Sequence, residues 1–307
     1  MARKILVVGA TGQQGKAVIA ALHAQTRTPR PTTCDDRPIQ ILALTRSASS
    51  PKSQALAARH PDIVLAEGDT RNPEPIFAAH PDISSVLLVT VPPGDEEQAL
   101  PFIEAAVAPG RQVEHMVFSS VDRGGDLKSW AEPTPVPHFA AKHRIELRLR
   151  QLCDNAGVRW TVLRPTGFMD TYNPGFFGQF MASLWAAGMP AERRMQLIST
   201  HDIGVFAARA LLDPQQWMGR AVSLAGDDLS FRELQDVYRR TVGQELPQTY
   251  RILAHTALWW VKDAYMSFEW FSTAGYGADI PSLREQEPGL QTFEKWLRES
   301  SQWDSRG

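Results

Sequence analysis

The sequence predicts an α/β protein of the Rossmann type, a doubly wound parallel sheet with a smaller, mainly helical C-terminal lobe. In the first half of the 307 residues, short β-branched runs alternate with longer amphipathic stretches, which is typical of a parallel sheet covered on both faces. A glycine-rich turn joins the first apolar run directly to a helix-forming segment. Beyond about residue 166 the alternation stops, and aromatic residues and methionines gather. We therefore expect a Rossmann domain at 1–165 and a second lobe at 166–307, interleaved with the sheet and with a cleft between them.

Six apolar runs are expected to form the sheet, and five amphipathic stretches are expected to form the helices between them. The expected strands are Ile5–Val8, Ile39–Leu44, Ile63–Ala66, Val86–Thr90, His115–Ser119 and Trp160–Leu163, and the expected helices are Gly15–Ala24, Ser53–Arg59, Pro73–Ala79, Glu96–Ala108 and Phe139–Asn155.

The intervening and C-terminal segments give weaker signals. Thr26–Pro38 has no apolar periodicity and contains prolines, so we expect a mobile surface loop. Asp122–Pro137 is rich in glycine and proline, which predicts a long functional loop after the fifth strand. Asp202 is expected to cap a helix over Val205–Leu212. Charged residues interrupt the apolar stretch Leu253–Phe271, which predicts an amphipathic helix rather than a membrane span.

Composition excludes several classes of protein. A hydrophobic fraction of 43% with 21% charged residues is ordinary for a globular chain. The 32 Lys and Arg against 34 Asp and Glu give a net charge of −2, so no field favours direct binding to nucleic acid or to anionic membranes. Cys34 and Cys153 are too few for a disulfide framework and lack the spacing of a zinc site, so we expect no metal and a reducing, cytoplasmic compartment. The apolar run near the N-terminus is about four residues long, whereas a signal peptide needs at least ~7.

The strongest motif is the turn Gly9–Gly15, which reads Gly-Ala-Thr-Gly-Gln-Gln-Gly and links the first strand to a helix. In a turn that binds a dinucleotide, Gly9 makes the tight bend, Gly12 lets the backbone approach a pyrophosphate, and Gly15 packs the helix on the strand. We expect Gly9, Thr11, Gly12, Gln13, Gln14 and Gly15 to contact the cofactor.

The end of the second strand predicts which dinucleotide binds. An NAD enzyme usually places an acidic residue there, whereas this chain has Thr45-Arg46-Ser47. The guanidinium of Arg46 would pair with a 2′-phosphate, which favours NADP.

Further cofactor contacts are expected at the ends of the next strands. Asp69 and Thr70 follow the third strand, where Asp69 would accept from the adenine amine. Thr90, Val91 and Pro92 end the fourth strand under the pyrophosphate and ribose. Ser119 and Ser120 close the fifth strand at the carboxyl edge of the sheet, where ligands bind in open α/β folds. Either hydroxyl would orient a carbonyl oxygen or, alternatively, cap the turn, and we expect Ser119 to contact the cofactor.

Together these residues resemble the NmrA-like proteins, a branch of the atypical short-chain dehydrogenase/reductase relatives. The resemblance covers most of the chain, and its C-terminal part is similar to the tail common in fungal members. The family includes an NADP-binding transcriptional co-regulator, sensors of the NADPH/NADP ratio and, more distantly, isoflavone-reductase-like enzymes. The segments that carry the resemblance are Gly9–Gly15, Thr45–Ser47, Gly68–Asp69, His138–Lys142, Arg164–Met169 and Asp202–Gly204.

The resemblance also indicates candidate catalytic residues. Working short-chain dehydrogenases use a Tyr-x-x-x-Lys pair on one helix face, with the Tyr as proton donor. In this chain Lys142 is preceded at that spacing by His138, so the Tyr is absent. Isoflavone-reductase-like relatives use the Lys itself as the acid or base, and we expect Lys142, with His138 and Ser119, to form the catalytic set. The family places Pro165 and Phe168 near the nicotinamide, so both are expected cofactor contacts.

Two functions follow as hypotheses. The first is an NADPH-dependent oxidoreductase for an apolar or aromatic carbonyl or enone, whose pocket is lined by the C-terminal aromatic residues. The second is a non-catalytic NADP(H) sensor that binds a protein partner and works in the cytoplasm or nucleus. Either function suits a monomer or a homodimer.

Overall fold

The computed structural model describes residues 2–26, 37–249, 256, 259, 260 and 262–304. The expected mobile loop at Thr26–Pro38 and the start of the expected helix at Leu253–Phe271 lie almost wholly outside these residues. The described chain forms two compact units that interleave along the sequence. The first contains residues 1–120, 141–163 and 203–222, and the second contains 121–140, 164–202 and 223–307. The expected division at residue 165 stays a prediction.

The first unit is built on a seven-stranded sheet with the strand order β3-β2-β1-β4-β5-β6-β9. Adjacent strands from β3 to β6 pair in parallel, so their carboxyl ends lie at one edge. The strands are β1 (Arg3–Val7), β2 (Ile39–Thr45), β3 (Val64–Glu67), β4 (Ile83–Val89), β5 (His115–Ser119), β6 (Arg159–Pro165) and β9 (Arg220–Leu224).

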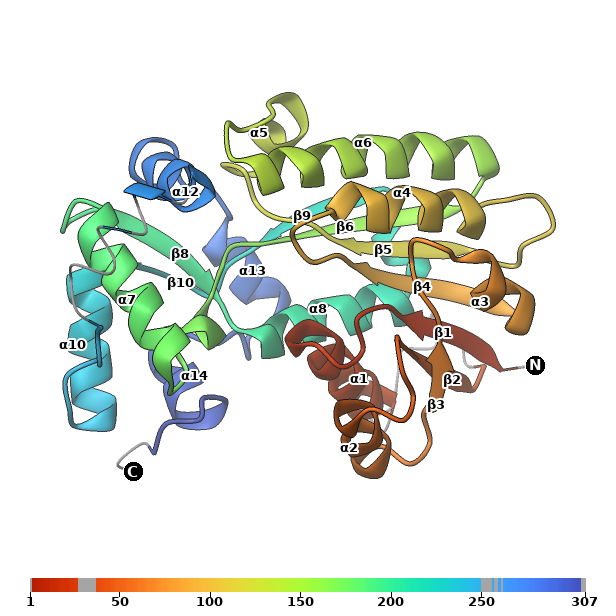
Figure 1. The fold of residues 1–307 in the computed structure, drawn as a ribbon, viewed down its shortest axis with the longest axis horizontal. Helices are drawn as coiled ribbons and strands as arrows, with labels where there is room; N and C mark the ends of the chain where they lie inside the picture. The colour runs from red at the N-terminus through yellow and green to blue at the C-terminus, as the bar shows by residue number, and fades with distance from the viewer. Residues whose placement is uncertain (1, 27–36, 250–255, 257–258, 261, 305–307) are drawn as a thin grey trace. The chain divides into compact units, whose positions relative to one another are not determined.

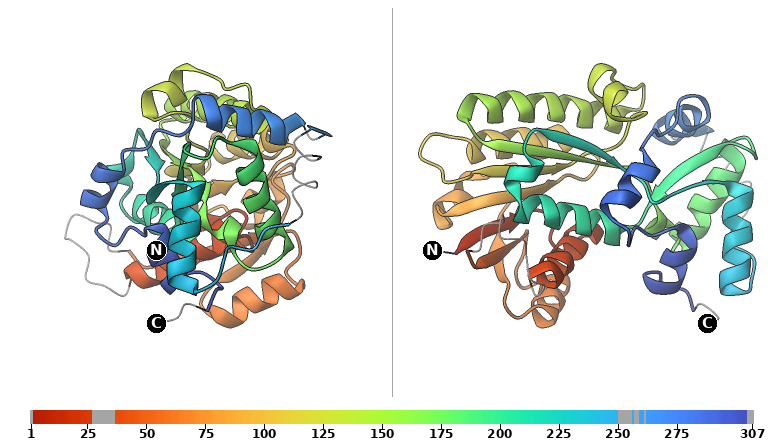
Figure 2. Two further views of the ribbon diagram at one scale, coloured as in Figure 1. Left: turned by 90° about the vertical axis from the view of Figure 1, so that its left-hand side faces the viewer. Right: turned by 180° about the vertical axis from the view of Figure 1, so that it is seen from behind.

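Helices cover both faces of this sheet, as the alternating sequence pattern predicts (Figure 1). Figure 1 shows α4 and α6 on one face and α1, α2 and α8 on the other, and the reverse view in Figure 2 shows the same arrangement. The helices are α1 (Gln13–Thr26), α2 (Pro51–Arg59), α3 (Glu74–Ala79), α4 (Asp95–Ala106), α6 (Pro137–Ala156), α8 (Thr200–Leu212) and α9 (Pro214–Trp217). The six predicted strands, the five predicted helices and the Rossmann-type fold are confirmed.

The second unit contains a three-stranded sheet that the sequence did not reveal, with the order β10-β8-β7. β8 pairs in parallel with β7 and antiparallel with β10. Its strands are β7 (Gly167–Phe168), β8 (Arg194–Ile198) and β10 (Asp227–Ser230), and its helices are η1 (Met169–Tyr172), α5 (Asp126–Ala131), α7 (Phe176–Gly188), α10 (Phe231–Val242), α12 (Lys262–Thr273), α13 (Ile280–Gln286) and α14 (Phe293–Glu299).

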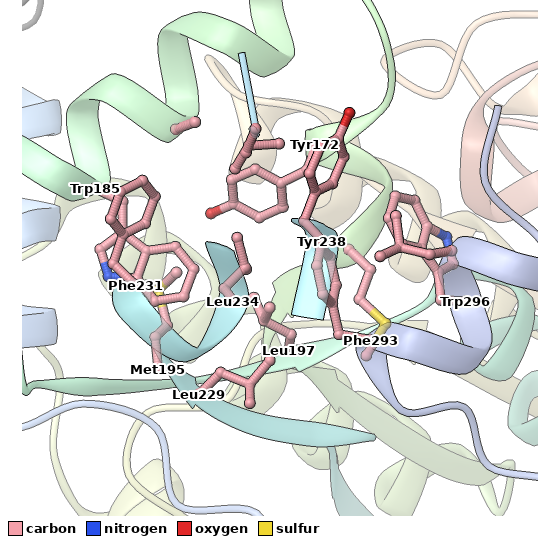
Figure 3. Packing of buried hydrophobic residues seen from close by; sticks show 14 of the residues in the cluster. Tyr172, Trp185, Met195, Leu197, Leu229, Phe231, Leu234, Tyr238, Phe293 and Trp296 are labelled. Atoms are coloured by element: carbon pink, nitrogen blue, oxygen red, sulfur yellow. The ribbon is translucent and has the colours of Figure 1, made fainter. Parts of the chain in front are cut away.

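Aromatic side chains fill the core of the second unit (Figure 3). Trp185 is buried, and its ring lies 5.9 Å from that of Tyr172 and 5.6 Å from that of Phe231. Phe176 and Phe177, in contrast, are exposed at the start of α7. The C-terminal aromatic residues therefore divide between core packing and the surface, and those in the core are held by one another.

The prediction of a loop over Asp122–Pro137 is wrong in one respect, because this segment contains the helix α5. Its start is organised by the buried carboxylate of Asp122, which accepts hydrogen bonds from the backbone amides of Gly124 and Gly125 at 3.0 Å. The same carboxylate accepts from the hydroxyl of Ser223 at 2.5 Å and from the amide of Gly277 at 2.8 Å. One acidic side chain thus joins three segments of the second unit. Periodicity did not reveal α5 because the helix has only six residues.

The predicted cap at Asp202 is also wrong, because α8 begins at Thr200. The hydroxyl of Ser199 accepts from the Asp202 amide at 3.0 Å and donates to its carboxylate at 2.7 Å. Asp202 therefore lies inside the first turn, and Ser199 supplies the side-chain cap. The Asp202 carboxylate also accepts from the amide of Gln291 at 3.0 Å, which ties the C-terminal segment to this turn.

Candidate functional site

The glycine turn adopts the close packing that a strand-to-helix phosphate loop requires. Gly9 has a φ of +73°, a conformation that favours glycine, and its carbonyl accepts from the Gly12 amide at 2.9 Å. A Cβ on Gly15 would lie 2.3 Å from the Gly9 carbonyl oxygen, so only glycine fits there. A Cβ on Gly12 would lie 3.2 Å from the same oxygen, which is tight but not prohibitive. The first amides of α1 have no intrahelical acceptor, so this turn suits a pyrophosphate.

The loop after β2 is ordered by hydroxyl groups. The buried Thr45 hydroxyl lies 2.8 Å from that of Ser53 and donates to the Ser47 carbonyl at 3.1 Å. Arg46 projects from this loop and is exposed, with no hydrogen bond or ion pair to any other residue in the described part of the chain. Its guanidinium is therefore available to an anionic ligand.

The segments after β3 and β4 also lie at the carboxyl edge of the sheet. Asp69 is exposed, and its carboxylate accepts from the Arg71 amide at 3.0 Å, whereas the neighbouring Thr70 is half-buried. After β4, the Gln98 amide donates to the Val91 carbonyl at 2.7 Å and to the Gly94 carbonyl at 2.9 Å. Gln98 thereby fixes the loop that carries Val91 and Pro92, both of which are exposed.

Lys142 lies at the centre of a buried polar cluster formed by α6, β4, β5 and α4. Its ammonium donates to the Thr90 hydroxyl at 2.6 Å and to the Ser119 carbonyl at 3.3 Å. It forms an ion pair of 3.2 Å with Asp95, and the Thr90 hydroxyl in turn donates to Asp95 at 2.6 Å. Only 7% of Lys142 and 3% of Asp95 are exposed. We call Lys142, Thr90, Asp95 and Ser119 the Lys142 cluster.

Burial governs the proton affinity of Lys142. Loss of solvent lowers the pKa of its ammonium below the usual value, and the charge of Asp95 opposes that shift. A lysine with a lowered pKa is a better proton donor near neutral pH than an exposed one. The cluster therefore has the chemistry of a tuned acid.

Two serines that follow one another at the end of β5 have separate partners. The Ser119 hydroxyl donates to the side-chain carbonyl of Gln14 at 2.6 Å, which links β5 to the first turn of α1. The Ser120 hydroxyl donates to the buried carboxylate of Glu146, one turn along α6 from Lys142. Ser119 thus connects the glycine turn with the Lys142 cluster inside the first unit.

His138 has a different set of contacts, all in the second unit. Its Nδ1 lies 3.0 Å from the carboxylate of Asp263 on α12, and the ring lies edge-on to Phe139. The side chain of His138 is 28% exposed and that of Asp263 is 48% exposed. The described contacts do not bring His138 to the Lys142 cluster, although the two residues are one turn apart on α6.

The remaining predicted residues also belong to the second unit. Pro165 ends β6, where its carbonyl accepts from the Asp122 amide at 3.1 Å. Phe168 is half-buried in β7 and pairs with Ile198 in the small sheet. Their expected contact with a nicotinamide stays a prediction.

Sequence reasoning missed Asp95, the charge partner of Lys142. Asp95, Glu96 and Glu97 are three consecutive acidic residues at the start of α4, a pattern that favours a helix N-terminus on its own. Glu96 pairs with Arg144 on the surface, and Glu97 is exposed. The sequence gives no indication of which of these three carboxylates is buried.

Comparison with known proteins identifies a family whose model matches most of the chain. The family model described as "NmrA-like family" matches residues 1–282. The chain belongs to the NmrA-like family. This confirms the resemblance expected from the glycine turn and the helix that carries Lys142.

Among curated proteins, this NmrA-like chain is 26% identical over 265 residues to the NmrA-like family domain-containing oxidoreductase himF of Aspergillus japonicus, covering 78% of this chain and 73% of that one. It is 26% identical over 178 residues to the Prestalk A differentiation protein A of Dictyostelium discoideum, covering 55% of this chain and about half (52%) of that one.

Solved structures share the fold. The crystal structure of Nmra, a negative transcriptional regulator, in complex with NAD superposes with a TM-score of 0.69 at 17% identity, covering 98% of this chain and 95% of that one. The NADPH-dependent quinone oxidoreductase QOR2 of Escherichia coli complexed with NADPH gives a TM-score of 0.67 at 19% identity, covering 96% and 98%.

None of the helices in the described ranges is both long enough and apolar enough to cross a bilayer.

Proposed function

We propose that this NmrA-like protein binds NADP(H) at the carboxyl edge of its seven-stranded sheet and reduces an apolar or aromatic carbonyl or enone. The observation that carries the proposal is the Lys142 cluster. It places a buried, proton-carrying ammonium at the ends of β4 and β5, in the same compact unit as the glycine turn.

The residues of the first unit fit a dinucleotide. The turn Gly9–Gly15 has no side chain at Gly12, where a pyrophosphate would approach the start of α1, and Arg46 is free to pair with a 2′-phosphate. Gln14 and Ser119 would lie along the same edge, because their side chains are hydrogen-bonded to each other. NADPH, when bound, supplies a hydride.

The chain's own part in the reaction is to deliver a proton. Lys142 would give one proton from Nζ to the oxygen that gains negative charge as the carbonyl carbon accepts the hydride. Asp95 and Thr90 would then hold the neutral amine in place until a proton from solvent restores the ammonium. His138, paired with Asp263, has no described contact with this cluster, so we assign the main role to Lys142.

The relatives support this class of reaction. The similarity to a fungal oxidoreductase extends over 78% of the chain, and the fold is shared with an NADPH-dependent quinone oxidoreductase. Aromatic ketones, quinones and enones are therefore the substrates to screen.

The decisive experiment follows NADPH absorbance with such a panel, in the unmodified protein and in Lys142→Met. We expect turnover with at least one substrate and a loss of 10²- to 10⁴-fold in kcat, typical of a missing proton donor, with little change in NADPH affinity. His138→Gln is the matched control on the same helix and should lose much less. Equal losses in the two variants would contradict the role given to Lys142.

A second candidate is an NADP(H) sensor that binds a protein partner. The observation in its favour is that four acceptors already surround the Lys142 ammonium and that a histidine paired with Asp263 replaces the expected tyrosine. In that case Lys142→Met weakens NADPH binding, and the unmodified protein has no turnover to lose. Absence of NADPH oxidation with every substrate, together with an NADPH-dependent partner interaction, would favour the sensor.

A further inference from the structure

A carboxylate lies beside the loop that carries Arg46. Glu67 is the last residue of β3 and is the direct sheet neighbour of Thr45, the last residue of β2. Its carboxylate accepts a hydrogen bond from the Ala48 amide at 2.8 Å. A negative charge therefore reaches the same loop as the guanidinium that is expected to bind the 2′-phosphate.

The loop has few other donors to offer an anion. The Ser47 amide bonds to the Thr45 hydroxyl at 3.3 Å, and the Ser50 amide bonds to the Ser47 carbonyl at 3.3 Å. The Ala48 amide is held by Glu67. What faces solvent is the guanidinium of Arg46 and the hydroxyl pair of Ser47 and Ser49, which lie 3.0 Å apart.

Glu67 and Arg46 do not neutralise each other by direct pairing. The two form no ion pair within the described residues, and both side chains are exposed. An incoming 2′-phosphate would thus meet one positive and one negative group, whereas the uncharged 2′-hydroxyl of NAD(H) forms no ion pair with Arg46 and meets no charge repulsion from Glu67.

We propose that Glu67 is a specificity-determining residue that weakens the preference of this chain for NADP(H) over NAD(H). The inference rests on the proposed dinucleotide function and adds the residue that sets its selectivity. Arg46 alone predicts a preference on the order of 10- to 100-fold, from a charge-assisted hydrogen bond of roughly 1.5–3 kcal/mol. Repulsion by Glu67 lowers the preference for NADP(H) in the unmodified protein below that range. The unmodified protein would therefore bind both dinucleotides.

Glu67→Gln is the informative variant, because a glutamine oxygen still accepts from the Ala48 amide while the charge is removed. Isothermal titration with NADP⁺ and NAD⁺ at low ionic strength should show NADP⁺ bound about two- to tenfold more tightly than by the unmodified protein, with NAD⁺ affinity unchanged. The gain should shrink in 0.5 M salt, where the Debye length is only about 4 Å. Arg46→Ala should weaken NADP⁺ binding in both backgrounds.

Glu104→Gln is the matched control, since it removes one negative charge from the same unit at a carboxylate that pairs with Arg148. Glu104→Gln should leave the ratio of the affinities for NADP⁺ and NAD⁺ unchanged. If Glu67→Gln changes both affinities equally, or neither, Glu67 only orders the loop and the inference is wrong while the proposed function stands. If the unmodified chain binds neither dinucleotide, the inference and the proposed function are both wrong.

Discussion

One helix carries two basic side chains in very different surroundings. On α6, Lys142 is buried and meets a carboxylate that is itself buried, whereas His138, one turn earlier, is half-exposed and meets a carboxylate that is half in water. The first pair has a hydroxyl and two carbonyls to complete its hydrogen bonds, whereas the second, among the described residues, has an aromatic neighbour instead.

This difference separates two kinds of contact between a basic side chain and a carboxylate. A buried pair gains little net stability from being formed, but losing one partner is costly because the other charge cannot return to water. A half-exposed pair is screened and contributes little either way. The Lys142 cluster should therefore tolerate few changes, and the His138 pair should tolerate many.

The largest expected effect comes from Asp95→Ala, which leaves the Lys142 ammonium buried without its carboxylate. We expect the free energy of unfolding to fall by about 3–5 kcal/mol. Asp263→Ala, the matched change at the other pair, should cost less than about 1 kcal/mol. Urea denaturation of both variants at pH 7 measures the contrast, and equal losses would mean that burial does not distinguish the two pairs.

The contrast between buried and exposed bases extends to His115, which is completely buried at the start of β5 and bonds to the Thr161 hydroxyl at 2.9 Å. Burial, reinforced by the nearby charges of Arg3 and Arg159, lowers the pKa of His115 from 6.5 to about 3. The folded protein thus holds the imidazole neutral where the unfolded chain would protonate it. This contribution to stability is complete above pH 6.5 and is lost as the pH falls from 6.5 towards 3, by as much as about 4 kcal/mol.

Acid denaturation curves of the unmodified protein and of His115→Gln test this directly. The variant should lose less stability between pH 6.5 and pH 3, because glutamine does not titrate. Parallel curves for the two proteins over that range would refute the assignment.

A smaller effect is expected from Thr90→Val, which keeps the shape of the side chain and removes the hydroxyl between Lys142 and Asp95. The loss should be about 1–3 kcal/mol, because a buried charged donor is left with one acceptor fewer. Thr90→Ser restores the hydroxyl and should recover most of the stability in the same denaturation assay. Failure of serine to recover it would indicate that the methyl group, not the hydroxyl, matters.

The smallest effect is expected from His138→Gln, which should change the free energy of unfolding by less than about 1 kcal/mol. Thermal denaturation at pH 7 measures it. A loss as large as that of Asp95→Ala would reverse the comparison between the two pairs.

Much of the first unit was predictable because its strands are continuous apolar runs separated by clear helix signals. His115–Ser119 is found where it was expected, and β1 and β6 differ from prediction by only a few residues. The strand β9 was missed because Arg220–Leu224 is a short segment that lacks such a run. The small sheet was missed for a similar reason, since β10 reads Asp-Asp-Leu-Ser.

The candidate site was predictable where a motif fixes the local geometry. The glycines of the turn could be named from their spacing, and the lysine of α6 from the family resemblance. Asp95 and Glu67 could not, because the role of each depends on which way one carboxylate among several points. Glu67 accepts a hydrogen bond from the amide of Ala48, 19 positions away in the chain, and sequence spacing gives no sign of that contact.

The Asp122 carboxylate has a consequence for the order in which the chain is made. Its hydrogen-bond partner Gly277 lies 155 residues further along the sequence. At a synthesis rate of about 5–20 residues per second, Asp122 leaves the ribosome roughly 8–30 s before Gly277 does. During that interval the acidic group is without one of its four donor groups, and the loop that it organises is incomplete. The loop that Asp122 organises in the second unit can therefore be completed only after the segment that contains Gly277 has been made.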